Sequence, residues 1–156
     1  MTARTRPGKV RRVAAGVALA AVCGIGAAGC TGRSLDASGA AAAYGPVVEA
    51  VTGVTGDALG VRWTRGSDET TQRGDDGCTW YSASFETATD LSSRMPELRQ
   101  ALDSSLGDRG FADARDEQLP GGWVAVTATD DQDARVAVQS KGRSTVRLSV
   151  PVSGDC

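Results

Sequence analysis

The second half of the chain alternates apolar and polar residues in short runs. Four runs are expected to form strands: 110–116, 122–129, 134–140 and 144–150. In the last three, apolar residues occupy every second position, which is the pattern of a strand with one buried face. The separators are short and rich in Pro, Gly and Asp, so consecutive strands are expected to pair as an antiparallel meander.

An amphipathic helix is expected just before these strands, because apolar residues recur there every three or four positions. They are Leu91, Met95, Leu98, Leu102 and Leu106. Pro96 removes one helical hydrogen bond, so regular helix is expected to begin near Arg94, with the proline in its first turn. Gly107 is expected to end this helix.

A short helix and a strand come first in the predicted domain. Pro46 suits the first turn of the helix, and Gly56 marks its end. Leu59, Val61 and Trp63 then alternate with polar residues, as strand residues do.

A polar loop over 67–77 is expected to lead into a second strand over 78–85. Because successive strand residues point to opposite faces, the side chains of this strand divide into two sets. One face is expected to carry Cys78, Trp80 and Ser82, the other Tyr81, Ala83 and Phe85.

The element order favours an α+β fold. Its simplest form is a single antiparallel sheet with the long amphipathic helix packed on one face and a short N-terminal helix beside it.

The N-terminus has the pattern of an export signal. Residues 1–12 contain five basic residues and no acid, and 13–28 are uncharged and mostly apolar. Such a basic-then-apolar segment is typical of a signal peptide. The apolar run is shorter than the ~20 residues of a membrane-spanning helix, so a retained transmembrane helix is the weaker interpretation.

The segment Ala27-Ala28-Gly29-Cys30 has the form of a bacterial lipobox. Its small residues suit a peptidase groove, and the thiol that follows can accept a diacylglycerol. Cys23 is a poorer candidate because the branched Val22 precedes it. We therefore expect residues 1–29 to be removed and Cys30 to be lipidated. Two acyl chains are enough for stable anchoring.

Three segments follow from this interpretation. Residues 1–29 form a lipoprotein signal peptide, 30–43 a flexible tether of small polar residues, and 44–156 the α+β domain. The run of alanines over 40–43 could instead extend the first helix backwards.

Charge and composition exclude several functions. The part after residue 29 holds all 19 acidic residues and 12 of the 17 basic ones, which gives a formal charge of −7. Such an acidic domain is a poor binder of nucleic acid. The chain contains no histidine, which excludes histidine-dependent triads and zinc sites with histidine ligands.

Two cysteines remain after lipidation, Cys78 and Cys156. An exported protein can oxidise them to a disulfide. In the chain-entropy model, closing a loop of this length stabilises the fold by roughly 4 kcal/mol. The alternative, a redox pair, usually needs close spacing.

Three tryptophans are the candidate ligand platform: Trp63, Trp80 and Trp123. Trp80 and Trp123 are expected to face away from the valine-bearing side of the strands. The alternative is that the three indole rings close the edge of a small core.

Other candidate chemistry is weak, and we expect no metal, cofactor or catalytic residue. The acids at Asp130, Asp131 and Asp133 lack the remaining ligands of a calcium loop and are interpreted as a hairpin turn. A serine nucleophile would need Lys141 as its base. A carboxylate pair could hydrolyse glycosides, but among 19 acids some pair is always close enough.

The layout of the chain resembles that of small uncharacterised lipoproteins of actinobacteria. The shared features are the lipobox at Cys30, a polar tether, one α+β domain and a cysteine pair that ends at Cys156. The resemblance implies diacylglyceryl attachment, usually N-acylation, and a place on the outer face of the plasma membrane. The resemblance assigns no catalytic residue to this chain.

We therefore expect a non-enzymatic binding module that is held to the membrane by lipid and contacts an unidentified envelope protein or small ligand. The alternatives are a carrier of a small apolar ligand and a carboxylate-dependent cell-wall hydrolase.

Overall fold

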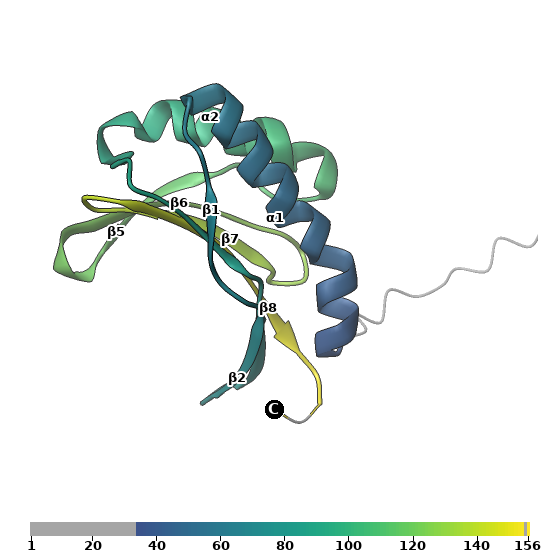
Figure 1. Cartoon of the computed structure of the whole chain (residues 1–156). Helices are drawn as coiled ribbons and strands as arrows, with labels where there is room; N and C mark the ends of the chain where they lie inside the picture. Colours follow the sequence, from purple (N-terminus) through teal and green to yellow (C-terminus); the bar gives the residue numbers. More distant parts are fainter. Residues whose placement is uncertain (1–33, 155) are drawn as a thin grey trace, which may run out of the picture. The chain divides into compact units, whose positions relative to one another are not determined.

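The computed structural model describes residues 34–154 and 156. Two α-helices and one antiparallel sheet make up most of this part of the chain (Figure 1). The helices are α1 (Ala37–Leu59) and α2 (Met95–Leu106), with short 3-10 turns at Ser92–Arg94, Gly107–Arg109 and Pro120–Gly122. The strands are β1 (Thr64–Ser67), β2 (Thr70–Gly74), β3 (Gly77–Tyr81), β4 (Ser84–Thr87), β5 (Arg115–Leu119), β6 (Trp123–Thr129), β7 (Arg135–Ser140) and β8 (Ser144–Val152).

The sheet runs in the order β1, β4, β8, β7, β6, β5, and every neighbouring pair is antiparallel. The last four strands form the expected meander. Strand β8 is nine residues long and pairs with β4 over its first part and with β3 over its last part. Strand β2 pairs with β3. The predicted α+β class with a single antiparallel sheet is confirmed.

Both helices cover the same face of the sheet (Figure 1). Helix α1 packs over β8 and β3, α2 packs over β6 and β5, and the two helices contact each other. The core between these layers consists mainly of valine from the strands and leucine from α2. Its fully buried members include Val51, Leu98, Leu102, Leu106, Val126, Val136, Val138, Val146, Leu148 and Val150. Burying each such side chain stabilises the fold by ~1.5–3 kcal/mol.

The first helix corrects two predictions. It is the longer of the two described α-helices, with 23 residues, and it begins at Ala37. The expected short helix after residue 44 is therefore wrong, as is the part of the expected 30–43 tether that overlaps α1. Asp36 caps the helix by accepting a hydrogen bond from the Gly39 N–H at 2.6 Å. Buried Ala40 and Tyr44 show why these residues are ordered: they pack against the core.

Pro46 lies inside α1 and does not begin it. Because proline has no N–H, the carbonyl of Ala42, one turn earlier, loses its helical donor. Both residues are exposed, so water can replace that hydrogen bond.

The region between the helices contains two further corrections. Leu59 is the last residue of α1, with Gly60 in the left-handed conformation after it (φ 63°), so no strand begins there. The expected loop over 67–77 contains β2, and Asp75-Asp76 forms the turn between β2 and β3. A polar hairpin at the edge of a sheet has no apolar alternation, so the pattern did not reveal it.

The expected positions of α2, β6, β7 and β8 hold to within two residues. The first strand of the meander does not, because β5 occupies Arg115–Leu119 and not 110–116. Gly107 keeps helical torsion angles, and the chain turns three residues later at Gly110 (φ 83°).

The beginning of the described chain is attached to its end. The N–H of Ser153 donates to the carbonyl of Leu35 at 2.7 Å, and the Ser153 hydroxyl donates to the carbonyl of Ser34 at 3.2 Å. Leu35 also packs against the core. The sequence Ser34 to Asp36 is therefore part of the folded domain, which shortens the expected tether further.

Cys78 and Cys156 form the expected disulfide, with their Cα atoms 6.0 Å apart and 78 positions between them in sequence. It ties the C-terminal tail to β3.

Neither of the helices within 34–154 has the length and apolar character needed to cross a bilayer. The predicted signal peptide and Cys30 lie outside the described residues.

Candidate functional site

A one-residue bulge interrupts the sheet where β3 passes into β4. Tyr81 lies opposite Ser149 and Phe85 lies opposite Val146, so four steps on one strand match three on the other. The extra residue lies within the Ser82–Ala83 break between β3 and β4. A bulge of this kind shifts every later side chain to the other face.

The bulge brings Trp80 and Phe85 to the same face. Trp80 is paired with Val150 and Phe85 with Val146, and both valines point toward the helices. In an unbroken strand, residues five positions apart face opposite ways. The prediction that put Trp80 and Phe85 on opposite faces is therefore wrong, as is the expectation that Trp80 faces away from the valines.

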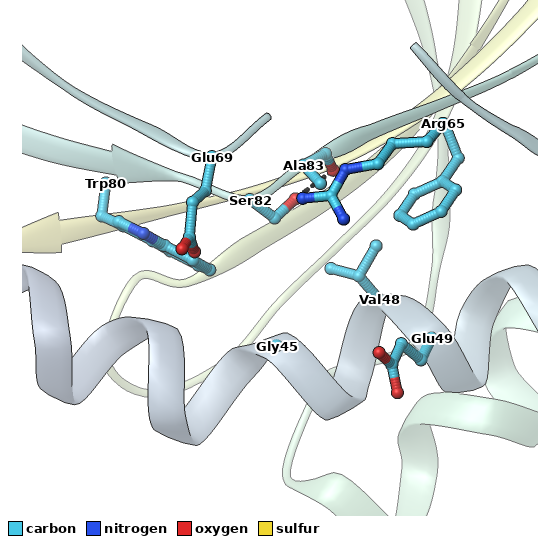
Figure 2. Close-up of a pocket in the computed structure, with 9 residues that line it drawn as sticks. Gly45, Val48, Glu49, Arg65, Glu69, Trp80, Ser82 and Ala83 are labelled. Carbon is cyan, nitrogen blue, oxygen red and sulfur yellow. Dashed lines mark hydrogen bonds between the residues drawn. The ribbon is translucent and has the colours of Figure 1, made fainter. Parts of the chain in front are cut away.

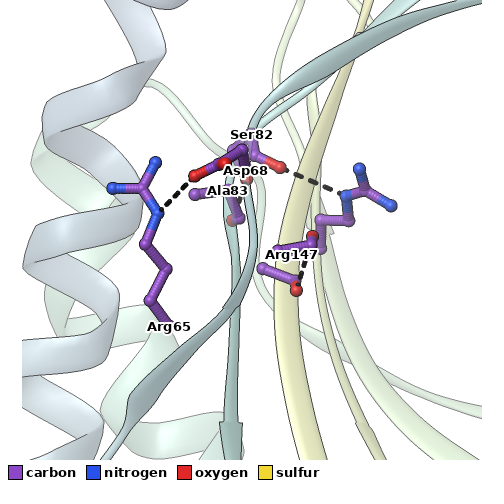
Figure 3. Close-up of polar contacts among 7 residues, drawn as sticks. Arg65, Asp68, Ser82, Ala83 and Arg147 are labelled. Atoms are coloured by element: carbon purple, nitrogen blue, oxygen red, sulfur yellow. Dashed lines mark hydrogen bonds and ion pairs between the residues drawn. The ribbon is translucent and has the colours of Figure 1, made fainter.

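Hydrogen bonds hold the bulge from both sides. The Ser82 N–H donates to the Leu148 carbonyl at 2.9 Å, and the Leu148 N–H donates to Ser82 Oγ at 3.0 Å. On the other face, Arg147 Nε donates to the Ser82 carbonyl at 3.2 Å (Figure 3). The same guanidinium lies over the Tyr81 ring, 4.7 Å from its centre. The bulge is thus a fixed part of the fold.

A cavity of about 170 Å³ lies between the bulge and α1, and we call it the central hollow. Figure 2 shows the side chains around it. Its lining residues are Gly45, Val48, Glu49, Arg65, Glu69, Trp80, Ser82, Ala83 and Phe85. Gly45 leaves the helix surface bare here, since a Cβ at this position would meet no atom within 4 Å beyond its own stretch of helix.

Two shallower hollows continue the central hollow along α1. One shares Glu69 and Trp80 with it and reaches back to Ala37 at the start of the helix. The other shares Glu49 and Phe85 and includes Trp63. Together they make a groove between α1 and the strands of the β1–β4 region.

Charged groups of both signs surround the central hollow. Arg65 Nε lies 3.1 Å from Asp68 Oδ1 (Figure 3). The two terminal nitrogens of Arg65 have no partner among the described residues. The side-chain carboxylates of Glu49 and Glu69 likewise make no hydrogen bond or ion pair with another residue in the described part of the chain. In Figure 2 the Arg65 guanidinium and the Glu69 carboxylate both extend into the space above α1.

Trp80 supplies the most specific feature of the hollow. The residue as a whole is only 3 % exposed, and its indole N–H donates to no other described residue. Among the described residues no buried side-chain nitrogen or oxygen lacks a hydrogen-bond partner, so this N–H is the part of Trp80 that stays open to solvent. Since Trp80 lines the central hollow, this donor is available to a bound molecule.

The three tryptophans do not form one platform. Trp63 lies in the adjoining hollow, and its indole N–H donates to Thr55 Oγ1 at 3.0 Å. Trp123 is in β6, separated from β3 by β7 and β8, and by alternation with Val124 it faces away from the helices as expected. The structure therefore brings two of the predicted residues to the groove and leaves the third elsewhere.

The acidic segment at Asp130 is a turn, as interpreted from the sequence. Asp130 Oδ1 accepts from the N–H groups of Gln132 and Ala134, both at 2.9 Å, and Oδ2 accepts from the Tyr44 hydroxyl at 2.6 Å. Burial raises the pKa of Tyr44 well above its usual value, and the hydrogen bond to Asp130 raises it further. Across residues 34–154, no group of three or more acids or cysteines is placed to hold a metal ion.

Asp90 anchors the start of the α2 region to the β7–β8 turn. Its carboxylate accepts from the Ser92 N–H at 2.9 Å, the Ser140 hydroxyl at 2.7 Å and the Gly142 N–H at 2.7 Å. These hydrogen bonds, the Ser92 backbone first, hold the pKa of Asp90 far below its usual value. No local pattern could reveal this role of Asp90, because its partners in the turn are about 50 residues away.

The serine–lysine alternative finds no support in this geometry. The Lys141 ammonium donates to the Gly121 carbonyl, and the Ser105 hydroxyl donates to the Leu102 carbonyl at 3.1 Å. Lys141 lies in the β7–β8 turn, as expected.

Neither a protein-family model nor a curated protein matches the chain. Among solved structures, the fold is similar to the crystal structure of a DUF4853 family protein from Actinomyces odontolyticus ATCC 17982, with a TM-score of 0.50. The two chains are 10 % identical, and the match covers 74 % of this chain and 70 % of the other. At this identity, the likeness establishes a shared fold.

Proposed function

We propose that this protein is a lipid-anchored binding module on the outer face of the plasma membrane, and that it holds a small polar ligand in the central hollow. One observation carries the binding part of the proposal: Trp80 is almost fully buried and lines an open cavity, and its indole N–H remains accessible there without an acceptor in the described chain. The lipobox at Cys30 supports the location.

The size and lining of the hollow favour a small polar ligand over an apolar cargo. At about 170 Å³ the cavity is smaller than the ~300–1,000 Å³ of pockets that enclose drug-sized molecules. Arg65, Glu49 and Glu69 line it, and an apolar ligand would leave these charges unpaired. The groups around the hollow include no nucleophile paired with a base, so binding without catalysis is the simplest function for them.

The lipid would hold this site close to the membrane. Ser34 is four positions after Cys30 in the sequence, and four fully extended steps of the chain span at most ~14 Å. Leu35 is already fixed to the C-terminal tail through Ser153. One end of the groove lies at Ala37, two residues further along.

Mass spectrometry of the protein from its native membranes tests the anchor. We expect a mature N-terminus at Cys30 that carries a diacylglyceryl group, and release of the Cys30→Ser variant from the membrane fraction. An uncleaved or unmodified N-terminus would refute the proposed location.

Binding is tested by what the purified protein retains. Full-length wild-type protein and a Gly45→Leu variant, whose side chain would fill the hollow, are extracted from the same membranes. Mass spectrometry of the organic extracts should show a small molecule in stoichiometric amount only with the wild type. Equal content in both proteins, or none in either, would argue against the central hollow as the binding site.

A further inference from the structure

We propose that the ligand of the central hollow carries an α-amino-acid group, meaning a free ammonium next to a carbonyl or carboxylate. A free amino acid and the amino terminus of a peptide share this chemistry. The inference rests on the proposed binding function and names its ligand class.

Hydrogen-bond donors line one part of the hollow. The Trp80 indole N–H is accessible and has no acceptor among residues 34–154. Arg65 uses Nε for Asp68, which leaves its two terminal nitrogens as a fork of donors. Such a fork matches the two oxygens of a carboxylate or the oxygen of a carbonyl. The ligand therefore presents an acceptor to this side.

Carboxylates line the rest of the central hollow. Glu69 extends from the segment between β1 and β2, and Glu49 from α1, and neither is paired with another described residue. Carboxylates accept hydrogen bonds from an ammonium group, and the aromatic faces of Trp80 and Phe85 attract a cation as well. The ligand therefore presents a positively charged donor to this side.

The balance of charge favours a ligand that carries both signs. Two carboxylates and one arginine line the hollow, all three on exposed residues, and Asp68 already offsets part of the arginine's charge. A phosphate or another purely anionic ligand would be repelled by Glu49 and Glu69. A simple amine would leave the Trp80 N–H and the Arg65 fork to water. A group with an ammonium and an oxygen acceptor on adjacent atoms can contact both sets.

The dimensions fit one residue, with room for a chain to continue. The central hollow of about 170 Å³ is bounded by Val48, Ala83 and the bare surface at Gly45. The adjoining hollows open from it toward both ends of α1. A free amino acid would fill the centre alone, and a peptide could extend from the centre into the groove.

Calorimetry with full-length protein in detergent tests this ligand class. The probes are L-alanine, L-alanyl-L-alanine, N-acetyl-L-alanine and ethylamine. We expect saturable binding of alanine or the dipeptide, and at least tenfold weaker binding of the acetylated probe, which lacks the ammonium, and of ethylamine, which lacks the acceptor. Preference for alanine indicates a free amino acid, and preference for the dipeptide indicates a peptide amino terminus.

Two variants locate the binding. Glu69→Gln should weaken binding of the preferred probe at least tenfold without lowering the melting temperature of the protein. Glu97→Gln, a matched change at an exposed position on α2, should leave binding unchanged. Equal affinities of the acetylated and free probes, or equal effects of the two variants, would overturn the inference.

The outcome also separates this inference from the function on which it rests. If no probe binds at millimolar concentration while the wild type still retains a molecule that Gly45→Leu loses, the ligand class is wrong and the binding function stands. If the extracts hold no such molecule either, the binding function itself fails.

Discussion

The two halves of the sheet are built from similar strands but differ in regularity. In the half made of β5 to β8, pairing is continuous: β6 and β7 match over six consecutive residues, and so do β7 and β8. In the half made of β1 to β4, the register shifts between Arg65 and Ser67 and again at the Ser82–Ala83 bulge. Both halves have α-helices on the same face.

The difference shows how a small domain can hold a core and a site on one surface. The regular half is closed, with Val126, Val136 and Val138 at most 1 % exposed beneath the helices. The irregular half turns Trp80 and Phe85 toward the same space and leaves an opening beside α1. We infer that regular pairing provides stability and that the interruption provides the site, and four changes test this division.

The largest loss of stability is expected when the disulfide of the irregular half is removed. Replacing Cys78 and Cys156 by alanine removes a disulfide that spans 78 positions, and should lower the free energy of unfolding by about 4 kcal/mol. Denaturant unfolding measures this loss of stability for the whole domain. Hydrogen exchange should show the greatest loss of protection in β2 and β3, and uniform loss across the sheet would contradict the division.

The second-largest loss of stability is expected in the regular half. Leu102 on α2 is 0 % exposed, so Leu102→Ala leaves a cavity and should destabilise the fold by about 3 kcal/mol. Ligand binding in the central hollow should not change, because Leu102 does not line it. Gln100→Ala on the exposed side of the same helix is the control, and it should change the free energy of unfolding by no more than ~0.5 kcal/mol.

A smaller loss is expected at the bulge itself. Ser82→Ala removes the oxygen that accepts from the Leu148 N–H, and an unsatisfied buried N–H costs about 1–3 kcal/mol. Unlike Leu102→Ala, this change should also weaken ligand binding, since Ser82 lines the hollow. Ser104→Ala, at an exposed position on α2, should affect neither quantity. Unchanged binding in Ser82→Ala would show that the bulge does not shape the site.

The smallest change in stability is expected at Gly45. Gly45→Ala adds a methyl group that meets no atom within 4 Å beyond its own stretch of helix. Because a Cβ before Pro46 is crowded by the proline ring, the helix-forming advantage of alanine is reduced, and the free energy of unfolding should change by less than ~1 kcal/mol. The methyl narrows the central hollow, so affinity should fall. Gly53→Ala, on the same helix, is the control that should stabilise α1 by about 1 kcal/mol and leave the affinity unchanged. Equal affinities of the two variants would refute the role of Gly45.

The same contrast explains what the sequence could predict. Val146, Leu148 and Val150 alternate without interruption, and Leu98, Leu102 and Leu106 recur at helical spacing, so β8 and α2 were placed correctly. These patterns are local, and burial on one face produces them directly. The disulfide followed from simple elimination among four cysteines.

The site could not be predicted, because it depends on a change of register. Up to Tyr81 the strand alternates as expected, and the single extra residue after it reverses the faces for Phe85. Ser82 and Ala83 do not predict a bulge, since neither is the glycine or proline that usually marks an interruption in a strand. The first turns of α1 appeared only as an alternative, the backward extension through the alanines at 40–43, which the structure supports. Ala40 shows no strong apolar signal, yet it is completely buried.

The attachment of Leu35 to Ser153 determines how the domain would respond to mechanical load. A pull on the chain ahead of Ser34 is met at once by the hydrogen bonds from Ser153 to Leu35 and Ser34. The last residue of the C-terminal tail is covalently joined to Cys78 in β3. Part of the load therefore passes into the sheet as well as along α1, which would slow unravelling of the domain from its N-terminal end.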